Sequence, residues 1–241
     1  MSVKKHIIFT ADDFGMTPEV NQAILHSHTS GILHAASLMM AQPGSEEAVA
    51  MARAHPQLQM GWHLHLNDSI PATLARWPWG DSPARAGTSI SLSRKSRSIM
   101  EREIARQWEL FQSTGLRCEF INSHHHLHAH PAVFQTLLKI VGDSFKGWIR
   151  LGRVRSFQPM FDFFSNSILV DAFFQRQRRL SIWPSTDTLW GLDRLFVMKA
   201  HEVRAAVATL PGGLHEFLFH PRYLSCPDTQ CLLHLNAQPL D

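Results

Sequence analysis

The sequence lacks the features of membrane-spanning, disulfide-rich and nucleic-acid-binding proteins. It has no run of about 18 apolar residues, so no transmembrane helix is expected. The apolar stretch near the amino terminus is too short for a signal-peptide core, which predicts a cytoplasmic location. Three cysteines at irregular spacing, without a CxxC pair, do not indicate a disulfide framework. The 23 basic and 20 acidic residues leave a net charge of +3, too weak a bias to indicate nucleic-acid binding.

Several well-known catalytic and nucleotide-binding motifs are also missing. The chain has no HExxH, no GxGxxG, no P-loop and no GxSxG elbow. These absences argue against a zincin protease and against a dinucleotide or P-loop nucleotide site. What the sequence does contain is sixteen histidines against a single tyrosine. Because histidine is the commonest metal ligand and the usual acid or base near neutral pH, the positions of the histidines are the informative feature.

The pattern of elements predicts an α/β fold. A chain of 241 residues with 44% hydrophobic and 18% charged residues fits a single globular domain spanning residues 1–241. Strands are expected at 6–10, 35–40, 58–66, 117–122, 148–151 and 214–219, and helices at 17–30, 45–54, 96–114, 131–141, 160–180 and 201–210. This alternation indicates βα units and a mostly parallel sheet.

Two segments fall outside this alternation. Residues 67–95 are rich in proline and glycine, which predicts a long, lid-like loop. Residues 222–241 show only weak helical periodicity, which predicts a short tail and an altered or missing closing helix.

Acidic residues and histidines follow the first and third predicted strands, where parallel α/β folds place their active sites. Asp12 and Asp13 come directly after the first strand. The pair indicates either a metal ligand beside a carboxylate that acts as a base, or a solvated turn before a helix. His63 and His65 would share one face of a strand, because the side-chain period of a strand is two. That spacing suits chelation, although two hydrogen-bonded histidines would give the same pattern.

The strongest signal is a histidine cluster after the strand that ends near Asn122. Five of the seven residues from 124 to 130 are histidine. In an extended stretch His124, His126 and His128 would lie on one side. His220 follows the last predicted strand, where it is either a further titratable group or a simple cap.

Taken together, one aspartate and two histidines from three strand ends would form an open site for zinc or another divalent ion. Such an ion lowers the pKa of water and polarises a carbonyl. A free carboxylate beside it would accept a proton, and a histidine would donate one to a leaving amine. The chemistry that uses these parts is hydrolysis of an amide or ester.

Four motifs, in order, resemble those of the YdjC-type carbohydrate deacetylases: ADDFG at 11–15, GWHL at 61–64, SHHHLH at 123–128 and EFLFHP at 216–221. The resemblance covers about residues 6–221. It implies an irregular (β/α) barrel of the glycoside hydrolase/deacetylase type and a metal-dependent N-deacetylase. Asn122 and the segments 187–192 and 210–217 resemble the branch associated with hopanoid biosynthesis.

The resemblance also implies roles for individual residues. Asp12 would be the general base that activates the metal-bound water, and His220 the general acid, with His128 as its rival. The ion would be Mg²⁺ or Zn²⁺, held by Asp13, His63 and His124. Substrate contacts would come from His65, His126, His128 and Trp62.

The implied substrate is an N-acetylated amino sugar, either a chitooligosaccharide or an N-acetylglucosaminyl hopanoid-like glycolipid. Trp62, Trp77 and Trp79 would stack on sugar faces or simply pack under a loop. The aromatic and arginine-rich segment 157–180 would make peripheral contact with a membrane, or form an ordinary amphipathic helix. The resemblance also suggests a homodimer, and Gly152–Val154 departs from the family pattern at a position expected to contact substrate.

Two other functions fit the same residues. A non-catalytic protein that sequesters or senses a metal would bind several ions per chain and would not depend on Asp12. A metallohydrolase of another ester or a phosphoester would also use the site, although a two-metal phosphatase usually needs more acids than this adjacent pair.

Overall fold

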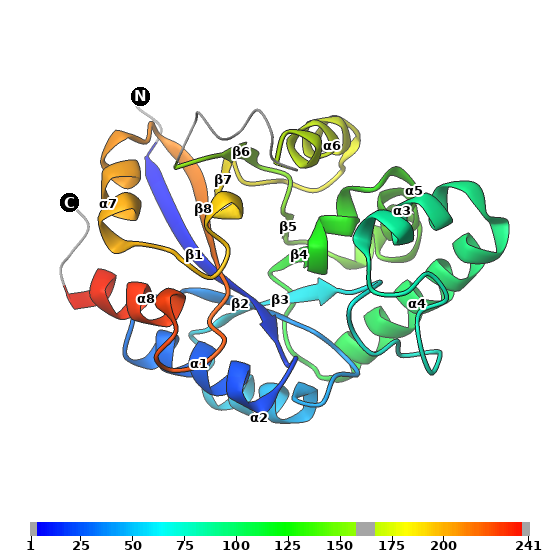
Figure 1. The fold of residues 1–241 in the computed structure, drawn as a ribbon, viewed down its shortest axis with the longest axis horizontal. Helices are drawn as coiled ribbons and strands as arrows, with labels where there is room; N and C mark the ends of the chain where they lie inside the picture. The colour runs from blue at the N-terminus through cyan, green and yellow to red at the C-terminus, as the bar shows by residue number, and fades with distance from the viewer. Residues whose placement is uncertain (1–3, 158–166, 238–241) are drawn as a thin grey trace.

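The computed structural model describes residues 4–157 and 167–237 of the chain, and these form one α/β domain (Figure 1). Eight parallel strands make one curved sheet in the order β5-β4-β3-β2-β1-β8-β7-β6. The strands are β1 (Lys5–Phe14), β2 (Ala35–Leu38), β3 (Gln59–Leu64), β4 (Phe120–Ser123), β5 (Trp148–Ile149), β6 (Arg153–Arg155), β7 (Thr188–Trp190) and β8 (Gly213–Phe219). The parallel, barrel-like sheet predicted from the sequence is confirmed.

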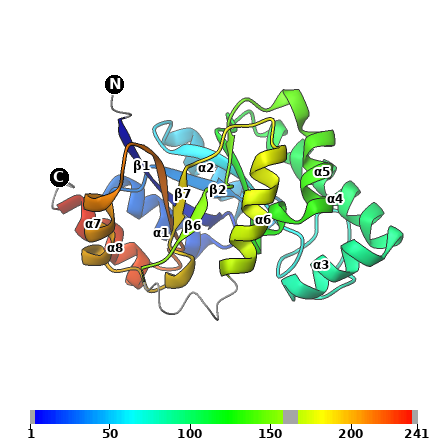
Figure 2. The same ribbon diagram turned by 90° about the horizontal axis from the view of Figure 1, so that it is seen from above.

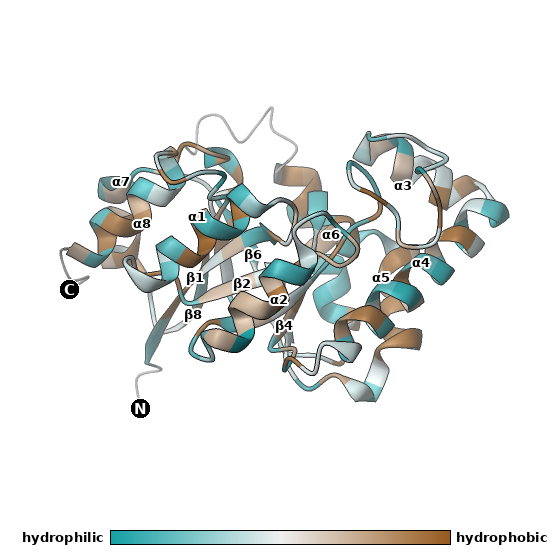
Figure 3. Cartoon of the chain, turned by 90° about the horizontal axis from the view of Figure 1, so that it is seen from below, coloured by the Kyte–Doolittle hydropathy of each residue, from teal (hydrophilic) through white to brown (hydrophobic). Residues whose placement is uncertain are grey.

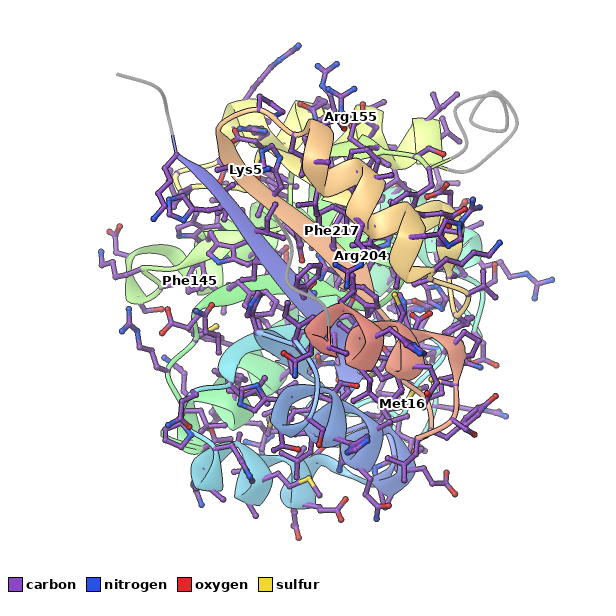
Figure 4. All side chains as sticks on the ribbon, turned by 90° about the vertical axis from the view of Figure 1, so that its left-hand side faces the viewer. Lys5, Met16, Phe145, Arg155, Arg204 and Phe217 are labelled. Atoms are coloured by element: carbon purple, nitrogen blue, oxygen red, sulfur yellow. The ribbon has the colours of Figure 1, made fainter. Side chains whose placement is uncertain are left out.

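The barrel is irregular because its two edge strands, β5 and β6, are not hydrogen-bonded to each other. Helix α6 (Ser167–Leu180) packs against β6, α5 and the segment after β4, so it covers this open side (Figure 2). The centre of the sheet is β1, which pairs with β2 on one side and with β8 on the other. Figure 4 shows β1 and β8 side by side, with Lys5 at the amino end of β1 and Phe217 on β8.

The other helices surround the sheet. They are α1 (Pro18–Thr29), α2 (Ser45–Ala54), α3 (Pro83–Leu92), α4 (Arg94–Ser113), α5 (Pro131–Ile140), α7 (Ala200–Thr209) and α8 (Pro227–Ala237), together with the short 3₁₀ helices η1 (His124–Ala129), η2 (Gly142–Ser144) and η4 (Leu192–Arg194). Helix α1 begins as its sequence predicts, with Pro18 in the first turn and the Thr17 hydroxyl accepting a hydrogen bond from the backbone N–H of Val20.

Helix α4 illustrates how a helical period is turned into a core face. Its buried side chains include Ile104, Trp108 and Phe111, which recur at three- and four-residue spacing and face the sheet. Figure 3 shows hydrophobic and hydrophilic residues alternating along α4, as expected for a helix with one buried face. None of the described helices is long and apolar enough to cross a membrane.

Some elements differ from the sequence prediction. The segment 67–95 is not a continuous loop, because α3 occupies its second half and α4 begins at Arg94. Strands β6 and β7 were not predicted, since each has only three residues. The expected loss of the closing helix was wrong: α8 follows β8 and packs on α1 and α7, with Leu232 and Leu235 buried. The predicted helical residues 160–166 lie outside the described residues.

Because all eight strands are parallel, their carboxyl ends meet at one edge of the sheet. The acidic residues and histidines of the four motifs lie in the last residues of β1, β3 and β8 or directly after β4 and β8, at or near that edge.

Candidate metal centre and the buried ion network

Asp12 and Asp13 lie at the end of β1 and point to different partners. They belong to the strand itself, which runs to Phe14 instead of ending at Thr10 as predicted. The pairing of β1 with β2 shifts register between Ala11 and Phe14, and Asp13 has a left-handed φ of 68°. Such an irregularity re-aims side chains. As a result the two neighbouring carboxylates face opposite nitrogens of His63, with Asp13 Oδ1 3.2 Å from Nε2 and Asp12 Oδ1 4.0 Å from Nδ1.

Asp13 meets two histidines from neighbouring strand ends. Its Oδ1 lies 3.2 Å from Nε2 of His63 and 2.9 Å from Nδ1 of His124. One potential ligand atom from each of the three residues lies within 4.8 Å of the others. Within the described part of the chain, Nε2 of His63 and Nε2 of His124 are buried and have no hydrogen-bond partner. The structure therefore brings the three predicted ligands together and leaves Nε2 of His63 without a partner beside Asp13. The unpartnered Nε2 of His124 lies on the other side of its ring, 3.8 Å from Asp68 Oδ2.

Contacts to Nδ1 fix the orientation of the His63 ring. Asn122 donates from Nδ2 to Asp12 Oδ1 at 2.8 Å, so its carbonyl oxygen faces His63. His63 Nδ1 then donates to that oxygen at 2.7 Å, and the Ser37 hydroxyl lies 3.0 Å from the same nitrogen. With the proton on Nδ1, Nε2 keeps the lone pair that a metal requires.

Asp12 is held by a buried arginine that the sequence did not single out. Arg150, directly after β5, is fully buried and donates to both carboxylate oxygens of Asp12, at 2.6 and 3.0 Å. Ser37 and Asn122 donate two further hydrogen bonds to Asp12. Burial alone would raise the pKa of Asp12, but the charge of Arg150, aided by His63, outweighs it and holds the pKa below its usual range. Asp12 is therefore an anchored carboxylate that stays ionised.

Arg150 also binds a second buried carboxyl group, Glu216 on β8. Nε and one terminal nitrogen of Arg150 donate to Glu216 Oε1 at 2.9 and 2.7 Å, and the Thr10 hydroxyl donates to the same oxygen at 2.8 Å. Glu216 Oε2 is buried without a partner among the described residues, and burial raises the pKa of Glu216. One guanidinium thus links two acids from β1 and β8.

The histidine cluster is not extended, so the expected shared face of His124, His126 and His128 is wrong. The segment forms η1, and His125 and His126 have left-handed φ values of 52° and 57°. His124 consequently faces Asp13, whereas His125 turns outward toward Asp68. His126 packs edge-on against Phe174 of α6, and its Nδ1 is buried without a partner in the described structure.

His65 and His128, the predicted substrate contacts, are fully buried and hydrogen-bonded to neighbouring segments. His65 donates from Nε2 to the Met40 carbonyl oxygen at 2.8 Å, and its Nδ1 lies 2.9 Å from the Ser69 hydroxyl. His128 donates from Nε2 to the Arg150 carbonyl oxygen at 2.7 Å, while the Ser123 hydroxyl contacts its Nδ1. Burial lowers the pKa of each imidazole to about 3. Both rings are therefore neutral and bridge neighbouring segments.

The tryptophans expected to stack on sugars also pack internally. Trp62 is fully buried against Trp108 of α4, because its side chain leaves β3 on the face opposite to His63. Trp77 and Trp79, in the segment between β3 and α3, stack on each other, and the Trp79 indole donates to the Leu66 carbonyl oxygen. Of the two interpretations of these tryptophans, the structure favours loop packing.

His220 follows β8 and lies near both aspartates. Its ring packs edge-on against Phe196, with ring centroids 5.3 Å apart, and its backbone N–H donates to Asp228 at 2.7 Å. Burial lowers the pKa of His220, while the negative charges of Asp13, Asp12 and Asp228 oppose that shift. Unlike His128, His220 has no ring nitrogen committed to a hydrogen bond in the described structure.

Backbone strain concentrates around these residues. In the described ranges, the non-glycine residues with left-handed φ are Asp13, Ala41, Asp68, His125, His126 and Phe196. All of them lie at, or in the segments beyond, the carboxyl ends of strands. Strained conformations of this kind cluster at functional sites, which supports the assignment of this edge as the active one.

Comparison with known proteins identifies the family of the chain and several similar proteins. The family model described as YdjC-like protein matches residues 6–236. A carbohydrate deacetylase of Brevibacillus brevis is 38% identical over 136 residues, which is 56% of this chain and 54% of that protein. A carbohydrate deacetylase of Geobacillus stearothermophilus is also 38% identical, over 54% of this chain and 53% of its own length. The matches to these curated relatives thus span about half of their length.

Among solved structures, one described as a candidate cellobiose-phosphate cleavage protein from Enterococcus faecalis has the same fold. It superposes with a TM-score of 0.66 at 20% identity and covers 98% of this chain and 91% of its own.

Proposed function

The chain belongs to the YdjC-like family, as its four motifs predicted, and from that premise we propose that it is a carbohydrate deacetylase that uses a bound divalent ion. The reaction would remove the N-acetyl group of an amino sugar. The observation that carries the proposal is the meeting of Asp13, His63 and His124 next to an ionised carboxylate, Asp12, that is held by Arg150. The carbohydrate deacetylases similar to this chain support the reaction class.

The donor set fits a divalent ion. Two imidazole nitrogens and one carboxylate oxygen are ligands typical of zinc, and Mg²⁺ is the alternative among harder ions. The unpartnered Nε2 of His63 and the convergence of the three residues are the structural reason to place an ion there. When bound, such an ion would polarise the acetamide carbonyl and lower the pKa of water.

The remaining groups divide the proton transfers between them. Asp12 accepts the proton of the water that attacks the acetamide carbon, with Arg150 and Asn122 keeping its carboxylate in one orientation. His220 donates a proton to the nitrogen as the carbon–nitrogen bond breaks, so that acetate and a free amine leave. Because His128 has both ring nitrogens engaged, His220 is the better general acid of the two.

An apolar rim beside His220 supports the glycolipid over the chitooligosaccharide as substrate. Phe196 contacts His220, and the Arg222 guanidinium lies 3.7 Å from the centre of the Phe196 ring. The segments that carry these two residues expose four large hydrophobic side chains, which define the rim: Leu195, Val197, Tyr223 and Leu224. Exposed apolar side chains grouped at a site mark contact with an apolar ligand or surface. An N-acetylglucosaminyl lipid, as in the hopanoid-associated branch, would place its apolar part there.

Acetate release by the purified, metal-loaded protein tests the reaction. The substrates are N-acetylglucosamine, diacetylchitobiose and an N-acetylglucosaminyl lipid. We expect Asp12→Asn to reduce release by about 10²–10⁴-fold, the usual contribution of a general base, while metal binding persists. The matched control is Asp143→Asn, an exposed aspartate on η2. Failure of all three substrates, or an Asp12→Asn protein as active as the control, would contradict the proposal.

The role of the rim is tested separately, by comparing the KM values of a rim variant for two substrates. Leu195→Ser should raise KM for the lipid-linked substrate and leave that for diacetylchitobiose unchanged. Leu92→Ser on α3, where the side chain is also exposed, is the control. Equal effects of Leu195→Ser on both substrates would remove the support for a glycolipid.

A further inference from the structure

A second set of possible metal ligands lies on the solvent side of His124. Asp68, in the segment after β3, places Oδ2 at 3.4 Å from Nε2 of His125 and at 3.8 Å from Nε2 of His124. One potential ligand atom from each of these residues lies within 4.8 Å of the others. The imidazole rings of His124 and His125 are 4.2 Å apart between centroids. The three side chains therefore converge, and the one hydrogen bond between them in the described structure is a long one, from His125 Nε2 to Asp68 Oδ2.

The separations match those of ligands around an ion. With metal–ligand distances near 2.0–2.1 Å, two ligands of a tetrahedral zinc ion lie about 3.3 Å apart. The two distances from the Asp68 oxygen are close to this value. Nε2 of His124, the atom that faces Asp68, is also buried without any hydrogen-bond partner in the described structure. A buried polar atom without a partner is costly, and an ion between these side chains would satisfy it.

Asp68 is positioned by both of its neighbours. The Asn67 side chain donates to the Asp81 carbonyl oxygen at 2.6 Å, and the Ser69 hydroxyl donates to the Asn67 carbonyl oxygen at 2.9 Å. The Asp68 and His125 side chains are 54% and 38% exposed, whereas His124 is 11% exposed. The set is therefore open to ions from solvent and less enclosed than Asp13, His63 and His124.

We propose that Asp68 and His125, together with His124, form an outer site for a second divalent ion, and that an ion bound there inhibits the enzyme. Two imidazole nitrogens and one carboxylate favour Zn²⁺ over Mg²⁺ or Ca²⁺, which prefer oxygen ligands. The outer ion binds more weakly than the inner one, because its ligands are more exposed. It inhibits because it draws on His124, which the inner site also uses, and because it lies at the mouth of that site. The inhibition, but not the ion binding, rests on the proposed deacetylase function.

Zinc binding to the metal-free full-length protein tests the site without any substrate. Calorimetric titration with ZnCl₂ should give a tight and a weaker binding event in the wild type. Asp68→Asn and His125→Gln should each lose the weaker event and keep the tight one. The control is Asp81→Asn, an exposed aspartate in the same segment. A single event in the wild type, or a weaker event that persists in both variants, would overturn the outer site.

Acetate release against zinc concentration then tests the inhibition. Wild type should be activated by about one equivalent of zinc and inhibited by excess, whereas Asp68→Asn should lose the inhibited phase. Inhibition that is the same in both proteins would refute the regulatory part. If no substrate releases acetate, the deacetylase proposal fails, but the two binding events still decide the outer site.

Discussion

Arg150→Met provides the most direct test of the buried ion network. Methionine keeps much of the apolar length of the side chain but removes every N–H that Arg150 donates to Asp12, Glu216 and Thr10. Breaking a buried ion pair by removing one partner costs about 3–5 kcal/mol, because the remaining charge is left without compensation. In a chain of this size each kcal/mol shifts Tm by about 2–4 °C. We therefore expect Tm at pH 7 to fall by roughly 6–20 °C.

The pH dependence of this loss distinguishes a charge effect from a packing effect. In the wild type, burial would raise the pKa of Asp12, but Arg150 outweighs it and holds the pKa below the usual value. That stabilisation is complete above the pKa of an unfolded aspartate, about 3.9, and is lost as pH falls through the lower folded value. In Arg150→Met, burial is no longer opposed by the guanidinium, so the pKa of Asp12 rises and acid neutralises the uncompensated charge. The difference in Tm should therefore shrink as pH falls from 7 toward 4.

Thermal unfolding of the metal-free proteins, followed by circular dichroism at pH 7 and pH 5, measures both effects. Adding Glu216→Gln to Arg150→Met should recover part of the loss, because one of the two buried acids is then neutral. Arg106→Met is the control: it breaks the exposed Arg106–Glu109 pair, which contributes at most about 1 kcal/mol. An Arg150→Met protein within 2 °C of wild type, or one whose loss is the same at both pH values, would refute the reasoning.

Three further predictions concern the supports of the site. Asn122→Ala should weaken metal binding about 10–100-fold in a chelator competition assay, because His63 loses the acceptor that fixes its tautomer; unchanged affinity would contradict this role. Since burial lowers the pKa of His65 and His128 to about 3, the unfolded state takes up their protons first as pH falls below 6.5. The free energy of unfolding should therefore decrease by about 5 kcal/mol between pH 6.5 and 4.5, which urea denaturation would measure, and a flat profile would exclude it. Gly61→Ala should cost about 1–3 kcal/mol in the same assay, because the added methyl would meet an aromatic ring of β4; a neutral result would show that the strands can separate there.

The convergence of Asp13, His63 and His124 could be predicted from the sequence because each residue lies at the end of a different strand or directly after it. In a parallel sheet the carboxyl ends of all strands meet at one edge, so short motifs at the ends of β1, β3 and β4 are enough to bring the three residues together. No knowledge of side-chain packing is needed for that step. The same rule predicts the barrel-like sheet without strands β6 and β7, which are too short to produce a periodic signal.

Arg150 could not be predicted in this way. It follows a strand of two residues and has no local motif that separates it from the exposed arginines of the chain. Its importance appears only when β1 and β8 bring Asp12 and Glu216 to it from distant parts of the sequence. The sequence marks Glu216 only as the first residue of the EFLFHP motif. The one available clue was that two buried acids at strand ends require a buried cation nearby.

The predictions for the histidine cluster and for the last helix were wrong for different physical reasons. The prediction that alternate histidines share one side assumes an extended backbone. His125 and His126 instead adopt left-handed φ values and turn the chain within two residues. Helix α8 has little amphipathic periodicity, and one of its buried residues, Asp228, is polar. The Asp228 carboxylate accepts hydrogen bonds from the backbone N–H groups of Met198 and His220, and so joins the segments after β7 and β8. A residue that holds two loops together breaks the apolar pattern that helix prediction relies on.

The adjacency of Asp12 and Asp13 raises the question of why both do not bind the same ion. Asp12 accepts four hydrogen bonds, two from Arg150 and one each from Ser37 and Asn122. A hydrogen bond to a charged group contributes about 1.5–3 kcal/mol, so turning Asp12 toward the ion would sacrifice several kcal/mol and leave Arg150 uncompensated. Among the described residues, the Asp13 carboxylate contacts only His63 and His124. In the proposed mechanism the ion would thus keep three protein ligands and open positions for water and substrate, while Asp12 would stay beside it, held by Arg150, as the proton acceptor. The irregularity at the end of β1 produces this division of roles, because it turns two successive carboxylates toward different partners.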